Sequence, residues 1–209
     1  MNEREQFYDD RKDFLTLAKE AIGYSKLDIK IKKLDDRAII PSYAHDGDVG
    51  MDITAISLEY DKELDMYVYH TGLSIETDKH YGVFLFARSS NRKTDAYLCN
   101  LVGIADTAIY RGEIIFCFKN RDSLLTIATR VKMDVFMCLM KTQSIVDAIK
   151  KAEDAFNEVM DNPMKFAPYQ VGDRIGQMVV LPYPDVKIRE VNELSQTERG
   201  SNGFGSTGN

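Results

Sequence analysis

The sequence ends on a stretch whose composition is typical of phosphate binding. GSNGFGST (200–207) combines glycines with serine and threonine, as in loops whose backbone N–H groups and hydroxyls hold phosphate oxygens. It lacks the lysine of a P-loop, and no residues remain in this sequence for the helix that normally follows one. The pattern therefore predicts a phosphate-binding segment that something other than a following helix must order.

Four further stretches are dense in glycine, arginine and carboxylate side chains. They are AHDGDVGMDI (44–53), ARSS (87–90), NLVGIADTAIYRGE (100–113) and GDRIGQM (172–178). In the second, a guanidinium fork and two hydroxyls suit phosphate oxygens. In the third, a single carboxylate, Asp106, interrupts an apolar run before a Tyr-Arg-Gly turn, as expected of a turn former or a positioned base. Taken alone, each stretch is better explained as ordinary β-turn chemistry.

The composition excludes several classes of function. With 44% hydrophobic and 29% charged residues, the chain has the balance of a soluble globular protein. A net charge of −6 argues against general affinity for nucleic acid or an acidic membrane face. No apolar run is long enough to span a membrane, and the acidic N-terminus does not resemble a signal peptide. We therefore expect a cytoplasmic protein, with Cys99, Cys117 and Cys138 as reduced core thiols.

The elements that must position these stretches are mostly strands. Apolar residues at helical spacing predict a helix before Gly23, after which short β-type runs dominate from Leu27 to about Thr129, SLLTIAT (123–129) among them. Residues 144–163 break this rhythm and predict one amphipathic helix capped by Ser144 and Asp147. Strand signals then return in DRIGQMVVLP (173–182) and DVKIREV (185–191). The spacing predicts an antiparallel sandwich or jelly roll.

Together and in this order, the five stretches resemble the five motifs of the trimeric dUTPase family, and the resemblance runs from about Leu27 to the end of the chain. It implies a mainly β, jelly-roll-like antiparallel sandwich or barrel, and a homotrimer with shared active sites. The expected organisation is an N-terminal helical extension (1–25), a β domain (26–194) with a helical insert at about 130–165, and a flexible C-terminal arm (195–209).

The implied reaction is hydrolysis of dUTP to dUMP and pyrophosphate by water attack on the α-phosphorus. Asp106 matches the general base, and Arg174 the arginine that helps hold that aspartate. Tyr110 resembles the tyrosine that packs under the sugar and leaves no room for a 2′-hydroxyl. The uracil pocket is expected from Asn100, Val102, Gly103, Ile104, Ala105 and Ile115.

The remaining matches fall on the triphosphate. Arg88, Ser89, Ser90 and Gln177 fit the β-phosphate side. The arm supplies Arg199, Ser206 and Thr207 to the γ-phosphate, with Gly205 beside them and Phe204 stacked on uracil. The resemblance also implies Mg²⁺ chelated mainly by the phosphates and waters, which Asp52 reaches only through water.

One departure from the family pattern concerns the sugar. The family has two residues between the catalytic aspartate and the tyrosine, whereas Thr107, Ala108 and Ile109 intervene here. A β-bulge is the expected way to absorb the extra residue and keep Tyr110 on the correct side.

Two alternatives to dUTP hydrolysis stay open at this point. A deoxycytidine-nucleotide deaminase on the same fold needs a second acid or base, and none stands at a matching position; a zinc deaminase is excluded by the lack of its histidine and cysteine motifs. A dUTPase-like regulator would bind nucleotide and engage a protein partner through the helical insert.

Overall fold

The computed structural model describes residues 27–141, 144–198 and 200–201. The predicted N-terminal helical extension therefore lies outside the described residues. The elements in chain order are β1 (Lys30–Lys33), β2 (Met51–Thr54), β3 (Ser57–Asp61), β4 (Met66–His70), β5 (Leu73–Glu76), β6 (Tyr81–Ala87), the 3₁₀ helix η1 (Ser89–Lys93), β7 (Ala96–Leu98), β8 (Val102–Ala105), β9 (Ile115–Asn120), α2 (Leu124–Leu139), α3 (Ile145–Asp161), the 3₁₀ helix η2 (Pro163–Phe166) and β10 (Arg174–Pro182).

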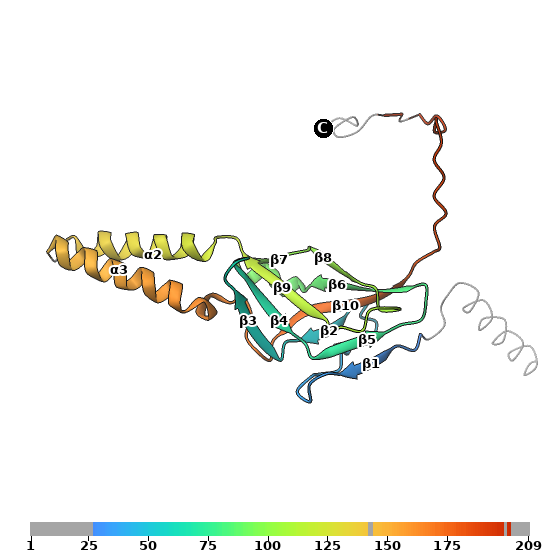
Figure 1. Cartoon of the computed structure of the whole chain (residues 1–209), viewed down its shortest axis with the longest axis horizontal. Helices are drawn as coiled ribbons and strands as arrows, with labels where there is room; N and C mark the ends of the chain where they lie inside the picture. Colours follow the sequence, from blue (N-terminus) through green and yellow to red (C-terminus); the bar gives the residue numbers. More distant parts are fainter. Residues whose placement is uncertain (1–26, 142–143, 199, 202–209) are drawn as a thin grey trace, which may run out of the picture.

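Two four-stranded antiparallel sheets form the body of the molecule. Their strand orders are β2-β10-β6-β8 and β3-β4-β9-β7, and a separate pair joins β1 to β5. Non-consecutive neighbours within each sheet mean that the chain repeatedly crosses between the two layers (Figure 1). The predicted mainly β, antiparallel architecture is confirmed.

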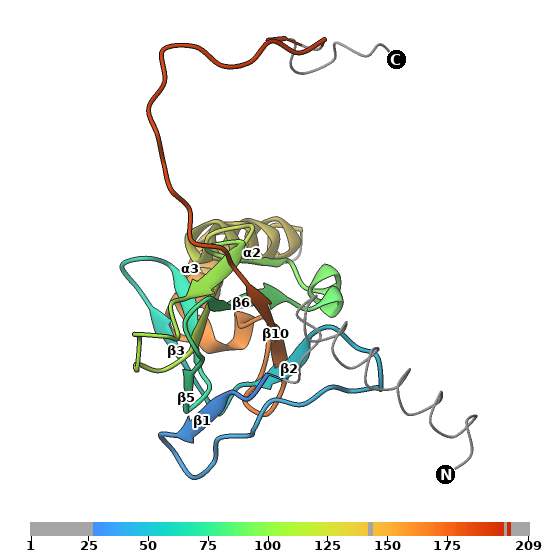
Figure 2. The same cartoon turned by 90° about the vertical axis from the view of Figure 1, so that its right-hand side faces the viewer.

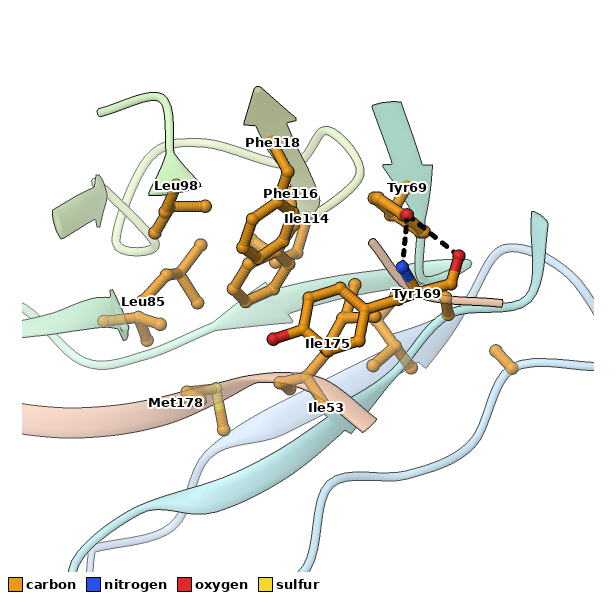
Figure 3. Packing of buried hydrophobic residues seen from close by; sticks show 14 of the residues in the cluster. Ile53, Tyr69, Leu85, Leu98, Ile114, Phe116, Phe118, Tyr169, Ile175 and Met178 are labelled. Carbon is orange, nitrogen blue, oxygen red and sulfur yellow. Dashed lines mark hydrogen bonds between the residues drawn. The ribbon is translucent and has the colours of Figure 1, made fainter. Parts of the chain in front are cut away.

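The core lies between these two sheets because alternate residues of each strand point inward. On β9, Phe116 and Phe118 are almost completely buried, whereas Ile115 is 42% exposed. Ile53 of β2 and Met178 of β10 face them from the other sheet (Figure 3). Tyr169, on the loop before β10, closes one edge of this core: its carbonyl accepts from Tyr69 Oη at 2.9 Å, and its N–H donates to the same oxygen at 3.0 Å.

The insert is a hairpin of two helices that projects from one end of the sandwich (Figure 1). The predicted cap of α3 is confirmed, since Ser144 Oγ accepts from Asp147 N at 3.2 Å. The predicted strand at 123–129 is wrong, because these residues cap and begin α2. Leu124, Ile127, Ala128 and Val131 recur at helical spacing and pack against α3, and this period outweighs the β-branched composition.

The apolar face of α3 is covered mainly by α2, a surface that the sequence analysis did not consider. Ala148, Ala152 and Val159 are buried there. Ile145 and Ile149, on the same helix, are 56% and 52% exposed. The described residues therefore cover only part of the apolar surface of α3.

Two further expectations are wrong. DVKIREV (185–191) is not a strand: after β10 the chain runs away from the body (Figure 2), with Val186 76% and Ile188 89% exposed. Cys138 is not a core thiol, because it is exposed on α2, whereas Cys99 and Cys117 are half-buried. Among the described residues, no helix is both long and apolar enough to cross a bilayer.

Candidate active site

A cavity of about 250 Å³ opens beside β8, between the turn that joins β7 to β8 and the loop after β8. It brings together most of the residues predicted for the base and the sugar. Its lining comprises Leu85, Asn100, Gly103, Ile104, Ala105, Asp106, Tyr110, Glu113, Ile114 and Ile115. Val102 is not among the lining residues, and Glu113 is a member that the sequence analysis missed, although it closes the same motif.

The turn from β7 to β8, which crosses from one sheet to the other, depends on local backbone geometry. Leu101 adopts the left-handed conformation (φ 57°) between β7 and β8. A Cβ on Gly103 would lie 3.1 Å from Leu85 Cβ and 3.2 Å from Asn100 Nδ2, so a larger residue would press on its neighbours. Among the residues that the structure describes, β8 is an edge strand whose one partner is β6. Its outward peptide groups are therefore free to bond a flat polar ligand.

The loop after β8 absorbs the extra residue in a turn rather than in a strand bulge. The carbonyl of Asp106 accepts hydrogen bonds from Ile109 N at 2.9 Å and Tyr110 N at 2.8 Å. The turn places Tyr110 on the cavity, where its hydroxyl donates to the Glu113 carbonyl at 3.1 Å. A Cβ on Gly112 would lie 2.2 Å from Tyr110 Oη, so the glycine makes room for the ring.

A second cluster of polar side chains surrounds Asp52 of β2. Its other members lie on β10 and just after β6. Asp52 Oδ1 accepts from Arg88 Nε at 2.9 Å and Gln177 Nε2 at 3.3 Å, and Asp52 Oδ2 accepts from Arg174 Nη1 at 2.8 Å. Burial opposes ionisation of this carboxyl, but the hydrogen bond from Arg174 and the charge of Arg88 outweigh it and lower the pKa of Asp52. The cluster holds two guanidinium groups in fixed positions.

Within its own chain, Arg174 has a partner that the sequence did not indicate, and its expected role toward Asp106 stays a prediction about neighbouring copies. Within the part of the chain that the structure describes, its guanidinium bonds to Asp52, and no hydrogen bond joins it to Asp106. The register of β10 shifts between Arg174 and Gly176, which directs the arginine toward β2. Both oxygens of Asp52 are thus engaged by protein groups.

Beside this cluster lies a cleft of about 340 Å³ lined by Arg88, Ser90, Tyr169, Gly172, Asp173 and Arg174. Ser89 and Ser90 begin the 3₁₀ helix η1 immediately after Arg88. Two guanidinium groups and a serine hydroxyl suit phosphate oxygens. Tyr169 was missed by the sequence analysis, and its position just before the fourth motif is the only signal that could have indicated it. Arg199, Phe204, Gly205, Ser206 and Thr207 lie outside the described residues.

The two clusters stand at opposite ends of β6. Ala105, next to Asp106, pairs with Val83, whereas Arg88 follows the other end of the strand. Val83 and Arg88 are five steps apart along the chain at about 3.3 Å each, or about 17 Å. In one chain the base cavity and the phosphate-type cleft are therefore separate.

Comparisons with known proteins identify the family. Residues 162–208 match the family model described as dUTPase. A deoxyuridine 5'-triphosphate nucleotidohydrolase of Trichodesmium erythraeum is 32% identical over 182 residues, which cover 86% of this chain and 98% of that protein. The chain belongs to the dUTPase family. A second dUTPase relative, from Clostridioides difficile, is 30% identical over 86% of this chain and 97% of its own length.

Solved dUTPase structures show the same fold. A mutant dUTPase of Staphylococcus bacteriophage 80alpha, determined with dUpNHpp, superposes with a TM-score of 0.57 at 21% identity. The superposition covers 87% of this chain and 98% of that one. The family resemblance read from the five motifs is confirmed, and this chain carries the motif residues on a dUTPase fold.

Proposed function

We propose that this chain hydrolyses dUTP to dUMP and pyrophosphate, with Asp106 as the general base that activates the attacking water. The observation that carries the proposal is the cavity beside β8, which Asp106 and Tyr110 both line, at the end of a strand whose outer edge is unpaired among the described residues. A carboxylate so placed can accept the proton of a water aligned on phosphorus. Because water attacks the phosphorus directly, this hydrolysis needs no side chain that forms a covalent bond to the substrate.

β8 and the turns on either side of it also account for the choice of base and sugar. Peptide N–H and C=O groups of β8 can bond the edge of uracil, and they mismatch the amino group of cytosine. Gly103 and the neighbouring Asn100 leave a narrow space, which excludes the methyl group of thymine. Tyr110 packs against the sugar and opposes a 2′-hydroxyl. These assignments follow the family motifs and the residues that line the cavity.

Arg88, Ser90 and Gln177 are assigned to the phosphates of a neighbouring copy's substrate. The separation of about 17 Å along β6 supports a site assembled between copies in a homotrimer, because the triphosphate would otherwise not reach both clusters. Exposed apolar side chains around the base pocket support the same assembly, since burial by another copy would remove them from water. They are Leu101 (73% exposed), Ile104 (68%) and Ile109 (83%).

Magnesium fits this arrangement as an ion carried by the substrate. No cluster of three or more potential metal-ligating side chains occurs among the described residues, and both oxygens of Asp52 are already bonded. Mg²⁺ keeps several waters and binds phosphate oxygens readily. When bound, it would offset the charge of the triphosphate, with Asp52 in contact only through water.

Product analysis tests the proposal directly. Purified protein is incubated with dUTP, dCTP, dTTP or UTP, with and without Mg²⁺, and assayed for pyrophosphate and ammonia. We expect pyrophosphate from dUTP alone. Ammonia from dCTP would support the deaminase instead, and no product from any nucleotide would support a binding protein. Light scattering after gel filtration measures the expected trimer.

A protein partner at the helical hairpin is a second proposed function. Exposed apolar side chains gather on its two helices, among them Met133, Met137, Val146 and Ile149. A structure of the phage 80alpha dUTPase is described as showing control of virulence-gene transfer by a G protein-like mechanism. We propose that the hairpin of this chain binds a protein, and pull-downs with intact and hairpin-deleted trimers test it.

A further inference from the structure

Two buried hydroxyl groups anchor the turn that carries Asp106. Thr107, the next residue, is completely buried, and its Oγ1 lies 2.6 Å from Oγ1 of Thr77. Thr77 is 4% exposed and stands just after β5, outside all five motifs. The Thr77 backbone N–H also donates to the Thr107 carbonyl at 3.4 Å. The residue after the proposed base is thus bonded to Thr77 through both side chain and backbone.

The direction of the hydroxyl bonds follows from their protons. Thr77 Oγ1 donates to the Tyr81 carbonyl at 3.0 Å, which uses its one proton. Thr107 Oγ1 must therefore donate to Thr77 Oγ1. A chain of two hydrogen bonds runs from the Asp106 turn to the first residue of β6, the strand that pairs with β8.

A guanidinium group binds the carbonyls along the whole of the same turn. Arg111 donates to the carbonyls of Thr107 at 2.7 Å, Ala108 at 3.2 Å and Tyr110 at 2.9 Å. It also forms an ion pair with Glu76 at 3.0 Å. Arg111 thus holds the carbonyls of the turn from Thr107 to Tyr110, and the Thr107 hydroxyl adds a side-chain bond at the residue next to Asp106.

We propose that Thr77 and Thr107 are positioning residues, which hold the Asp106 carboxylate in line with the attacking water through their shared hydrogen bond. The proposal rests on the function assigned to Asp106 above. Neither hydroxyl lines the base cavity, so nucleotide binding does not depend on them. A displacement of about 1 Å at a reacting group can lower turnover by about 100-fold. Loss of the pair should therefore act on kcat and leave KM little changed.

Isosteric substitutions in the full-length protein test this. Thr107→Val and Thr77→Val each remove one hydroxyl and keep the side-chain volume, whereas Thr107→Ser keeps the hydroxyl. Tyr67→Phe is the matched control: it removes a buried hydroxyl that donates to the Pro163 carbonyl at 2.9 Å, beside the helical hairpin. The readouts are kcat and KM for dUTP, the Kd of dUpNHpp, and the melting temperature.

Both valine variants should lose about 10-fold to 100-fold in kcat, with KM and the analogue Kd within about threefold of wild type. Thr107→Ser should retain at least about a third of the wild-type kcat, and Tyr67→Phe should lose stability without losing turnover. The double variant Thr77→Val/Thr107→Val removes both hydroxyls, so neither is left behind without its hydrogen-bond partner. Its kcat should therefore be no lower than that of the worse single variant.

Three results would overturn the proposal. The first is a kcat for Thr107→Val within about fivefold of wild type. The second is a serine variant as slow as the valine variant, and the third is multiplication of the two losses in the double variant. If wild-type protein itself releases no pyrophosphate from dUTP, the proposed function fails instead, and the two failures are thereby distinguished.

Discussion

Arg174 and Asp52, far apart in the sequence, meet through a hydrogen bond of 2.8 Å between Arg174 Nη1 and Asp52 Oδ2. The same carboxylate bonds Arg88, so one acid connects the ends of three strands. An isolated buried carboxylate would be costly, but two guanidinium partners stabilise its charged form. Asp52 thus holds the two guanidinium groups in place without a ligand, in the arrangement proposed above for phosphate binding.

Replacing this carboxylate by its amide should weaken phosphate binding. In Asp52→Asn, the charge that orients Arg88 and Arg174 is lost, and the two cations repel each other. We expect kcat/KM for dUTP to fall by about 10-fold to 100-fold, mainly through KM. Steady-state kinetics measure this, with Asp36→Asn as the control, because Asp36 is an exposed carboxylate in the turn after β1 and lines neither cavity. A KM unchanged in Asp52→Asn would contradict the role given to the cluster.

The same cluster predicts a dependence of stability on pH. Because the pKa of Asp52 lies below its ordinary value of 3.8, its ionised form stabilises the fold above that value. This contribution is lost as pH falls through the lowered pKa. Melting temperatures between pH 3 and 7 should therefore fall more steeply at the acid end for wild type than for Asp52→Asn. Parallel curves would contradict this prediction.

Asp106→Asn should keep the fold and nucleotide binding while abolishing most turnover. The amide fills the same space but cannot accept the proton of water, so kcat should fall by about 100-fold to 10,000-fold. Calorimetry should give a dUpNHpp affinity within about threefold of wild type. Near-normal turnover in this variant would place the base elsewhere.

Gly112→Ala should loosen discrimination against ribonucleotides. The added Cβ would overlap Tyr110 Oη, so the ring must leave its position on the cavity. We expect the ratio of kcat/KM for dUTP over UTP to fall by about 10-fold, since the steric barrier to a 2′-hydroxyl is displaced. Tyr110→Phe is the control, because it keeps the ring and removes only the hydroxyl. An unchanged ratio in Gly112→Ala would show that the position of Tyr110 does not determine discrimination between dUTP and UTP.

The helical hairpin should be dispensable for hydrolysis. α2 and α3 contact mainly each other, and the cluster at their base is formed by Leu124, Ala128 and Val159. Replacing residues 132–154 by a short Gly-Ser linker keeps that cluster. Turnover should stay within about threefold of wild type, because neither helix lines the base cavity or the phosphate cleft. A folded trimer without activity would show that the hairpin reaches the site.

Sequence patterns predicted most of the base pocket because its residues are close in the chain. Asn100 to Tyr110 come from β8 and the turns on either side of it, so a local motif specifies their meeting. The partner of Arg174 could not be predicted in this way, since it depends on the pairing of β10 with β2 and on a register shift. The contact of Thr77 with Thr107 could not be predicted for the same reason, because it joins two loops that no motif links.

The helical insert shows the other limit of sequence patterns. α3 was predictable from its cap and its long apolar period. The start of α2 was not, because Thr126, Ile127 and Thr129 have the composition of a strand. Its helical state is decided by tertiary packing, through the contacts of Leu124 and Ala128 with Val159.

The length of β6 has a genetic consequence. With the base-binding and phosphate-binding halves at opposite ends of one strand, each copy in the proposed trimer serves two different sites. A copy with a defective Asp106 still supplies intact arginines to the site of its neighbour. A copy with a defective Arg88 still supplies an intact general base, Asp106. Two such alleles, each inactive when expressed alone, should complement each other when co-expressed, and a lesion at one end of β6 would then behave as recessive.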